Sequence, residues 1–148
     1  DGGTRCASIT AANLALRLGV RRLIAAGVCL PKNMRPTEEQ RRSGWSPPAL
    51  SEEEQMAHEM RVMEHDVAAI SVGLIDGKSY LDLDYNLDSN ADVDMNVVKV
   101  SNGAFVEVQG TGEESTYQRQ ELDALLDMAD IGFEALFEMQ KTILHGQQ

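Results

Sequence analysis

The sequence predicts an α+β fold with helices packed on a mainly antiparallel sheet. Three observations lead to this prediction: a helical segment at residues 5–26, stretches of period-two alternation between residues 66 and 109, and a second helical segment at residues 122–143. Successive strands joined by short turns pair as antiparallel neighbours, and amphipathic helices bury their apolar sides on such a sheet. With 148 residues, the chain is long enough to bury one substantial core.

The first helix is expected to follow the permissive Gly2-Gly3 turn, with Thr4 as its N-terminal cap. Gly27 is of the residue type that commonly ends helices, and Gly19 could split or kink the segment. The apolar side of this helix is expected to consist of Ile9, Ala12, Leu16 and Leu23.

Residues 30–65 are expected to form a long loop or an insertion. All four prolines and the only tryptophan, Trp45, fall in this segment. Its second half favours a short helix, because Ser51 and Glu54 have capping-box spacing. The apolar side of that helix would consist of Met56, Met60 and Met63. All three histidines of the chain are expected to be exposed to solvent: His58, His65 and His145.

Four strands are expected to follow. They are residues 68–74, 79–85, 92–100 and 104–109. Asp76-Gly77 predicts a tight hairpin turn, and residues 101–103 predict another. Residues 110–112 are expected to form a loop before the last helix, in which Gly132 is a candidate break. The apolar side of that helix is expected to consist of Leu122, Leu125, Leu126, Ala129, Phe133, Leu136, Phe137 and Ile143.

The composition is that of a globular protein, with 43% hydrophobic and 25% charged residues. No apolar run is long enough for a membrane helix, and no signal peptide is recognisable. Two cysteines are too few to suggest a disulfide framework or a zinc site. A soluble, cytoplasmic protein is therefore expected, and the absence of an initial Met suggests a piece of something longer.

Charge is unevenly distributed within the net charge of −11. Residues 1–50 carry +5, whereas residues 51–148 carry −16. So acidic a chain would ordinarily repel nucleic acid, because neutralisation of phosphates drives most such binding. Any contact with RNA would need the basic first third of the chain, a metal ion or surface supplied by another chain.

Residues 81–97 concentrate five aspartates among apolar residues. They are Asp82, Asp84, Asp88, Asp92 and Asp94. A calcium loop of the EF-hand type is excluded, because Leu87 stands where that loop needs glycine and Val93 where it needs glutamate. Period two indicates that Asp82 and Asp84 are solvated residues of a strand, and it assigns no role to Asp92.

Asp88 and Asp94 are the candidate metal ligands of this stretch. Asp94 shares a strand face with Asn96 and Val98, whereas Asp88 lies in the preceding connection. Two carboxylates placed in this way could converge on Mg²⁺ and leave room for phosphate oxygens. A solvated acidic turn explains the same spacing, and the spacing alone leaves both interpretations open.

Gly3, Thr4 and Arg5 are the candidate anion site. Backbone N–H groups at a helix N-terminus bind anions, glycine permits close approach, and arginine offers a bidentate fork for phosphate. The alternative is a plain glycine turn followed by a threonine cap and a surface arginine.

Five segments, taken in order, resemble the second half of the ribonuclease PH family. They are DGGTRCASIT, DVAAISVGLIDGKSYLDLDY, DSNADVDMNVV, GAFVEVQGTGEE and ELDALLDMA, and the resemblance covers roughly residues 1–29 and 66–145. The family comprises phosphorolytic 3′→5′ exoribonucleases related to polynucleotide phosphorylase and the exosome ring. The resemblance implies a ribosomal protein S5 domain 2-like fold without its N-terminal half. The chain would be the C-terminal part of such a domain, with an insertion at about residues 30–65.

The resemblance also implies a phosphorolytic site. Gly3, Thr4 and Arg5 would bind inorganic phosphate, and Asp88 and Asp94 would hold Mg²⁺ and assist catalysis. Phosphate would attack the terminal phosphodiester and release a nucleoside diphosphate, so that no protein nucleophile is needed. Positioning and charge neutralisation would do most of the work, with Asp94 as a candidate general acid.

For the complete protein, the resemblance implies trimming of RNA 3′ ends, notably those of tRNA precursors, with rRNA among the other substrates. It implies a homo-oligomer in the form of a hexameric ring. The present residues alone are expected to have little activity. Two departures from the family pattern look tolerable: Cys6 stands where the family usually has threonine, and Ala11 where it usually has glycine.

Two other classes of function compete with this interpretation. The first is a non-catalytic ring subunit that scaffolds or binds RNA, as in some exosome members. The retention of Thr4, Arg5, Asp88 and Asp94 argues against it, because a subunit without chemistry has no need of them. The second is an acidic interaction domain, which the joint presence of both motifs disfavours.

Overall fold

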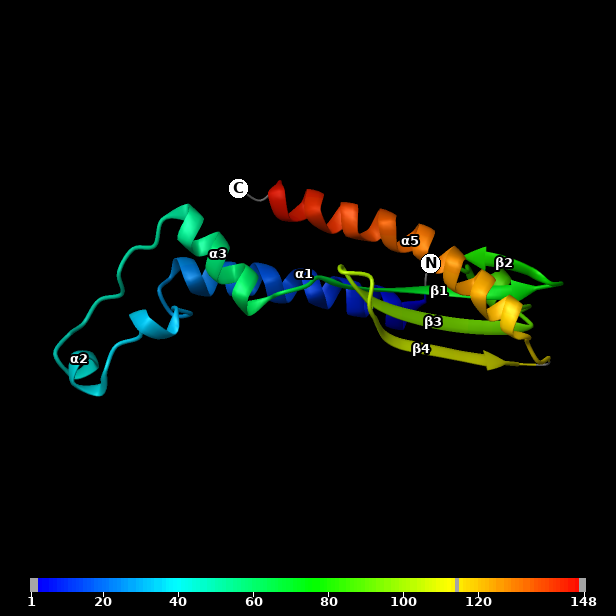
Figure 1. The fold of residues 1–148 in the computed structure, drawn as a ribbon, viewed down its shortest axis with the longest axis horizontal. Helices are drawn as coiled ribbons and strands as arrows, with labels where there is room; N and C mark the ends of the chain where they lie inside the picture. Colours follow the sequence, from blue (N-terminus) through cyan, green and yellow to red (C-terminus); the bar gives the residue numbers. More distant parts are fainter. Residues whose placement is uncertain (1–2, 114, 147–148) are drawn as a thin grey trace. The chain divides into compact units, whose positions relative to one another are not determined.

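The fold, described here by a computed structural model for residues 3–113 and 115–146, has the predicted α+β architecture (Figure 1). The described elements, in chain order, are α1 (Thr4–Ala25), the 3₁₀ helix η1 (Lys32–Met34), α2 (Glu38–Arg42), α3 (Glu52–Val62), β1 (Val67–Ile75), β2 (Lys78–Leu81), α4 (Tyr85–Asp88), β3 (Val93–Val100), β4 (Phe105–Gly112) and α5 (Arg119–His145). Two compact units share them. The sheet unit comprises residues 1–14 and 66–148, and the helical unit comprises residues 15–65.

The sheet is antiparallel throughout, with the strand order β2-β1-β3-β4. In the central pair, Val72 lies opposite Met95 and Gly73 lies opposite Asp94. The predicted hairpin turn between β1 and β2 is confirmed, because Asp76 and Gly77 have φ angles of 49° and 72°. Positive φ at both central residues is the geometry of the turn that matches the twist of paired strands.

One face of the sheet and one side of α5 form the main hydrophobic core. The core residues of the strands are Ala68, Ile70, Val72, Leu74, Val93, Met95 and Val97, and those of α5 are Leu125, Ala129 and Phe133. Alternate residues of β1 and β3 supply this face, as the period-two pattern predicts. The apolar side predicted for the last helix is confirmed along most of its length, but Ile143 is 38% exposed and Leu144 is buried in its place.

Gly132 does not break α5, which runs without interruption from Arg119 to His145. A Cβ atom at this position would lie 2.2 Å from Cδ1 of Ile70 and 2.9 Å from Cδ1 of Leu81. The glycine therefore permits the close approach of α5 to β1 and β2.

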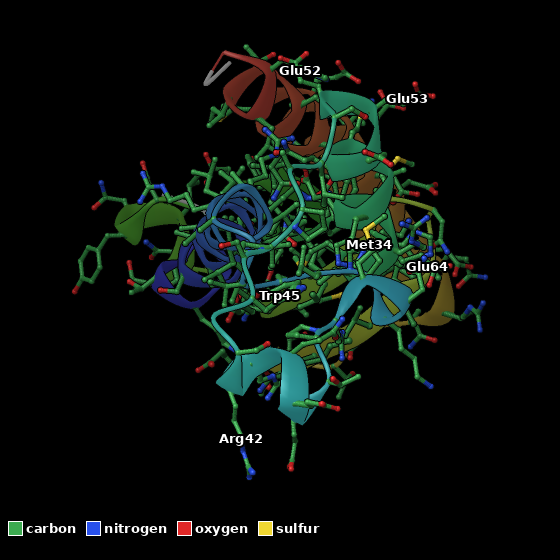
Figure 2. The ribbon with its side chains drawn as sticks, turned by 90° about the vertical axis from the view of Figure 1, so that its left-hand side faces the viewer. Met34, Arg42, Trp45, Glu52, Glu53 and Glu64 are labelled. Atoms are coloured by element: carbon green, nitrogen blue, oxygen red, sulfur yellow. The ribbon has the colours of Figure 1, made fainter. Side chains whose placement is uncertain are left out.

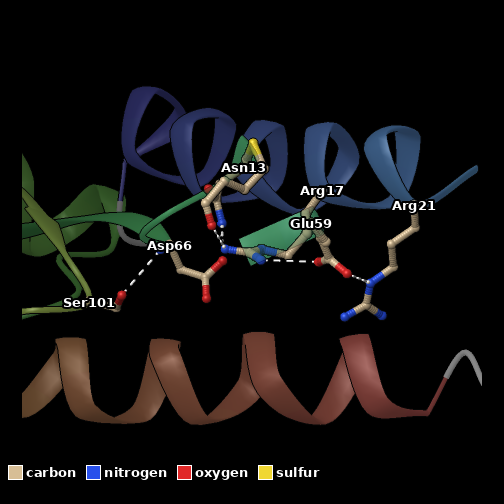
Figure 3. A network of polar contacts seen from close by, with 7 residues as sticks. Asn13, Arg17, Arg21, Glu59, Asp66 and Ser101 are labelled. Carbon is tan, nitrogen blue, oxygen red and sulfur yellow. Dashed lines mark hydrogen bonds and ion pairs between the residues drawn. The ribbon is translucent and has the colours of Figure 1, made fainter. Parts of the chain in front are cut away.

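The opposite face of the sheet packs against the first part of α1. Cys6, Ala69 and Val98 form a small buried cluster there, and Ala69 exchanges two hydrogen bonds with the Thr10 hydroxyl. Asn13 donates to Asp66, whose own N–H donates to the Ser101 hydroxyl (Figure 3). These contacts fix the start of β1 to α1, so that the two layers on the sheet are α5 and the beginning of α1.

The apolar side predicted for α1 is confirmed only at Ile9, which packs on the cluster of Cys6, Ala69 and Val98, and it is wrong further along the helix. Leu16 and Leu23 are 62% and 47% exposed, whereas Asn13 and Arg17 are buried. Each buried polar side chain has a specific partner: Asp66 for Asn13 within the sheet unit, and Glu59 for Arg17 within the helical unit. Burial of polar groups in this way is tolerated because they are hydrogen-bonded.

The ends of α1 also differ in detail from the prediction. The N–H of Ala7 donates to the carbonyl of Gly3, so Gly3, at φ 73°, occupies the cap position and Thr4 is already helical. Gly2 lies outside the described residues. The helix continues through Gly19 and stops two residues before Gly27, whose φ is 69°.

The helical unit is more ordered than a simple loop. The capping box of Ser51 and Glu54 is confirmed and starts α3, while η1 and α2 were not predicted. The prediction that His58 is exposed is wrong: it is 6% exposed, and its Nε2 lies 3.8 Å from Sγ of Cys29. Burial lowers the pKa of His58, and Arg61 and Arg35 add to this effect.

Two strand boundaries also differ from the prediction. The second strand ends at Leu81, because Asp82 has a φ of 57° and residues 85–88 are helical. The fourth strand continues through the expected loop to Gly112, since residues 110–112 pair with β3. No helix among the described residues is long and apolar enough to span a membrane. Cys6 and Cys29 are free thiols.

Replacing Gly132 with valine should destabilise the protein by about 1–3 kcal/mol, because the new side chain overlaps Ile70. The matched control is Gly19→Ala in the interior of α1, where nothing lies within 4 Å of a new Cβ. This substitution should stabilise the protein by roughly 0.5–1 kcal/mol. Chemical denaturation checks both values, and a neutral Gly132→Val would contradict the close packing of α5.

Candidate active site

The face of the sheet that packs on α1 carries a cluster of polar residues. Register places Gly73, Asp94 and Thr111 in one row across β1, β3 and β4. Ser71, Asn96 and Gln109 form the adjacent row. The prediction that Asp94 and Asn96 share a strand face is therefore confirmed, and the whole cluster lies opposite the main core.

The start of α1 is seated on the second of these rows. A Cβ on Gly3 would lie 3.7 Å from both Oδ1 of Asn96 and Cβ of Ser71. Cys6 donates its thiol proton to Oδ1 of Asn96 at 2.8 Å. Burial raises the pKa of Cys6 to about 11, so this thiol remains protonated and serves as a donor at neutral pH. Cys6 thus positions the first turn of α1 over β3.

Arg5 reaches from α1 to β4. Its Nη2 contacts both carboxylate oxygens of Glu107, at 2.6 and 2.7 Å, and its Nη1 donates to Oε1 of Gln109. The hydrogen bond and charge of Glu107 raise the pKa of Arg5. The Arg5 side chain is nevertheless 47% exposed, so Glu107 holds the guanidinium in one orientation while leaving part of it accessible to solvent.

Thr4 and the N–H groups of the first helical turn lie beside Arg5. The first turn of α1 contains no acidic residue, so no carboxylate of that turn offsets the positive end of the helix dipole. Thr4 is exposed, and it borders a shallow hollow together with Ala7, Ser8 and Ala11. The first turn of α1 therefore presents three kinds of hydrogen-bond donor to an anion: backbone N–H groups, the Thr4 hydroxyl and the Arg5 guanidinium.

Asp94 is half-buried, with the Ser71 hydroxyl 3.4 Å from its Oδ1. Burial raises the pKa of Asp94, and the charge of Asp88 raises it further, while the bond from Ser71 acts in the opposite direction. A carboxyl group in such surroundings holds a proton more readily than an exposed aspartate. This property suits a group that donates a proton during a reaction.

The connection between β2 and β3, which carries Asp88, packs on the same face of the sheet as Asp94. Leu83 is buried, and its Cδ1 occupies the space that a Cβ on Gly73 would need, at a separation of 2.6 Å. Gly73 lies directly opposite Asp94. Asp84 then caps α4 by accepting from the N–H of Leu87, and α4 ends at Asp88.

The remaining aspartates of the acidic stretch have other roles. Asp82 is not a strand residue, since it follows the end of β2 in a left-handed conformation. Asp84 is a helix cap and not a solvated strand residue. Asp92, to which the period-two pattern assigns no role, accepts a hydrogen bond from the N–H of Asp76 at 2.9 Å and so supports the hairpin turn.

The two carboxylates of Asp88 and Asp94 fit a magnesium ion. Burial raises the pKa of Asp94 and the negative charge of Asp88 raises it further, and a bound divalent cation would compensate that negative charge. Among the described residues no group of three His, Cys, Asp or Glu side chains could hold a metal. Magnesium is commonly bound by one or two carboxylates, with water and phosphate oxygens completing its shell.

Ser71, Asn96, Glu107 and Gln109 are site residues that the sequence did not single out. Asn96 was placed on the correct face, but its contact with Cys6 depends on how α1 docks. The alternation along β1 and β4 contains the signal for the others. This alternation identifies Ser71, Glu107 and Gln109 as site residues only when the register of β1 and β4 against β3 is known.

Replacing Gly73 with valine should displace Leu83 and with it the connection that carries Asp88. Binding of Mg²⁺ should then weaken about 10-fold or more, as for other changes that move a metal ligand indirectly. Calorimetric titration with Mg²⁺ measures this, with Gly19→Ala as control, since Gly19 lies within the helix α1 and nothing lies within 4 Å of a new Cβ there. Equal affinities in Gly73→Val and the parent would show that Leu83 does not position the site.

Comparison with known proteins shows which family the chain resembles. Residues 65–132 match the model of the 3′ exoribonuclease family, domain 2. Ribonuclease PH of Syntrophomonas wolfei subsp. wolfei is 42% identical over 144 residues, which are 97% of this chain and 48% of that protein. The ribonuclease PH proteins of Corynebacterium efficiens and Rhodopirellula baltica are 42% and 43% identical and are covered to 47% and 49%. The chain spans about half the length of these curated relatives, and it belongs to the 3′ exoribonuclease family that includes them.

Proposed function

We propose that this chain carries the phosphate-binding and catalytic groups of a phosphorolytic 3′→5′ exoribonuclease. The observation that carries the proposal is the meeting of the first turn of α1 with Asp94 on one face of the sheet. Arg5 contacts Gln109, whose register partner Asn96 is two residues from Asp94 on the same face. Two residues along a strand span about 7 Å, a distance that a phosphate group and its target can occupy.

Inorganic phosphate would bind at the first turn of α1. The N–H groups there, the Thr4 hydroxyl and the accessible part of the Arg5 guanidinium are the donors, with Gly3 allowing close approach. Glu107 holds Arg5 in place but also cancels part of its charge. The resemblance to the ribonuclease PH family implies that a further arginine for phosphate comes from the half of the relatives that this chain does not match.

The reaction joins an oxygen of phosphate to the phosphorus of the last phosphodiester and breaks the bond from that phosphorus to the 3′ oxygen. The products are a nucleoside diphosphate and an RNA shorter by one nucleotide. Asp94 is the candidate donor of the proton that the leaving 3′ oxygen takes up: burial and the charge of Asp88 raise its pKa, whereas a bound Mg²⁺ would lower it. The fixed positions of Thr4, Arg5 and Asp94 supply orientation, which contributes much of the acceleration in phosphate chemistry.

Mg²⁺, held by Asp88 and Asp94, would neutralise charge on the reacting phosphate oxygens. For the complete protein we propose RNA 3′ ends, including those of tRNA precursors and rRNA, as substrates. A hexameric ring in the cytoplasm is part of the same proposal. The similarity to ribonuclease PH proteins over the whole length of this chain supports these assignments.

A non-catalytic ring subunit is the competing function. The half-burial of Asp94 beside Asp88 speaks against it. The fold raises the pKa of Asp94, which means that the folded state favours its protonated form. When Asp94 ionises, the free energy of unfolding of the protein falls, so the folded state is less stable above that pKa than below it. A scaffold would gain nothing from this cost.

Asp94→Asn should lower the phosphorolytic rate by about 10²–10⁴-fold, because it removes the proton donor and a metal ligand. The same change should leave the melting temperature at pH 7 unchanged or raised, since it removes an ionised carboxylate from an unfavourable site. Both are measured on the protein expressed from its native start codon. A matched control is Asp127→Asn, an exposed aspartate of α5, which should leave the rate unchanged.

Arg5→Gln should raise the KM for phosphate about 10-fold or more, since it removes a charged donor to phosphate. The KM for RNA should change little. Initial rates at varied phosphate and RNA concentrations separate the two constants. An unchanged KM for phosphate, or a variant Asp94→Asn with full activity, would contradict the proposal and favour a scaffold.

A further inference from the structure

The helical unit contains a basic segment in an otherwise acidic protein. Residues 15–50 carry seven Lys or Arg against two Glu, which gives +5. The sheet unit, by contrast, carries five Lys or Arg against seventeen Asp or Glu, which gives −12. Four of these seven cations lie within residues 32–42, which are outside the segments that carry the family resemblance.

Two of the seven cations are structural. Arg17 and Arg21 donate to the two oxygens of Glu59, at 3.0 and 2.7 Å, from side chains that are 8% and 30% exposed (Figure 3). Arg17 also donates to the carbonyl of Met63. These contacts join α1 to α3 within the helical unit. The positive charge that can attract a ligand therefore lies on the other five cations of residues 15–50.

Four of those five lie within residues 32–42 and form what we call the basic surface. Its members are Lys32, Arg35, Arg41 and Arg42, and all of them are exposed. Figure 2 shows Arg42 extending away from α2 into solvent. The ion pair of Arg42 with Glu38, at 4.0 Å between side chains 84% and 89% exposed, is of the kind that contributes little.

The basic surface is an ordered structure and not a flexible tail. Thr37 and Gln40 form a complete capping box that starts α2, with bonds of 3.2 and 2.8 Å. The N–H of Trp45 donates to the carbonyl of Gln40. Pro47 packs over Gly27, where a Cβ would lie 2.4 Å from the proline ring. Binding to such a surface does not require the segment to order first.

We propose that the basic surface binds the sugar–phosphate backbone of RNA nucleotides that precede the reacting 3′ nucleotide in the strand. This inference rests on the proposed function, because a phosphorolytic exoribonuclease must hold a polyanion. Arginine forks suit phosphate geometry, and the half-buried Trp45 beside α2 offers a ring on which a base can stack. The net charge of −12 on the sheet unit cannot supply this attraction.

The test uses the protein expressed from its native start codon and compares two triple variants that change the charge by the same amount. The first is Lys32→Gln/Arg41→Gln/Arg42→Gln on the basic surface. The control is Lys78→Gln/Arg119→Gln/Lys141→Gln, which removes three exposed cations of the sheet unit. Fluorescence anisotropy measures the affinity for a long single-stranded RNA in buffer without inorganic phosphate, so that the RNA is not degraded, over a series of salt concentrations.

The first triple variant should bind the long RNA about tenfold more weakly, and its salt slope should fall by about 2, because each contact to a single strand contributes roughly 0.7. The control should change neither value. Phosphorolysis of a trinucleotide, which has almost no strand beyond the reacting nucleotide, should keep its kcat in both. A further variant, Lys32→Gln/Arg41→Lys/Arg42→Lys, keeps positive charge at positions 41 and 42. It should recover most of the salt slope of the parent protein.

Three results would overturn the inference. Equal losses in both triple variants would mean that only net charge matters. An unchanged affinity in the first variant would mean that the basic surface does not touch RNA. A changed sedimentation coefficient with unchanged RNA affinity would assign this surface to contact with a second copy. Failure of the proposed function is distinct, because it shows as absence of nucleoside diphosphate release in the parent protein, whatever the RNA affinity.

Discussion

The register of β1 against β3 is the constraint on which the rest of the structure depends. It places Val72 opposite Met95 on the face that α5 covers, and Gly73 opposite Asp94 on the face that α1 covers. A shift of one residue would turn Asp94 into the core and expose the valines. Because seven strand residues bury their side chains against α5, the same packing that stabilises the fold fixes which face carries the candidate site.

The candidate site is assembled by ordinary packing contacts between elements distant in the sequence. Leu83 seated over Gly73 holds the connection that carries Asp88, and Cys6 bonded to Asn96 brings the first turn of α1 over β3. Burial and the charge of Asp88 raise the pKa of Asp94, so the ionised form of Asp94 is disfavoured in the folded state. Such a shift in pKa is common where chemistry and not stability determines the residue.

Much of the fold could be predicted from patterns that local physics creates, but the contacts between elements could not. Alternation identified the strands, and the capping box at Ser51 identified the start of α3. The buried side of α1 was missed because it is polar, and its partners lie more than 40 residues away. The pairing of Arg5 with Glu107 depends on the register of β4, which sequence spacing does not reveal.

The most direct test of the central claim follows the oxygen atoms of inorganic phosphate. The protein, expressed from its native start codon, is incubated with RNA, Mg²⁺ and phosphate labelled with ¹⁸O, and the released nucleotides are analysed by mass spectrometry. The account predicts nucleoside diphosphates that carry the label in their terminal phosphoryl group. Release of nucleoside monophosphates, with oxygen taken from water, would contradict it.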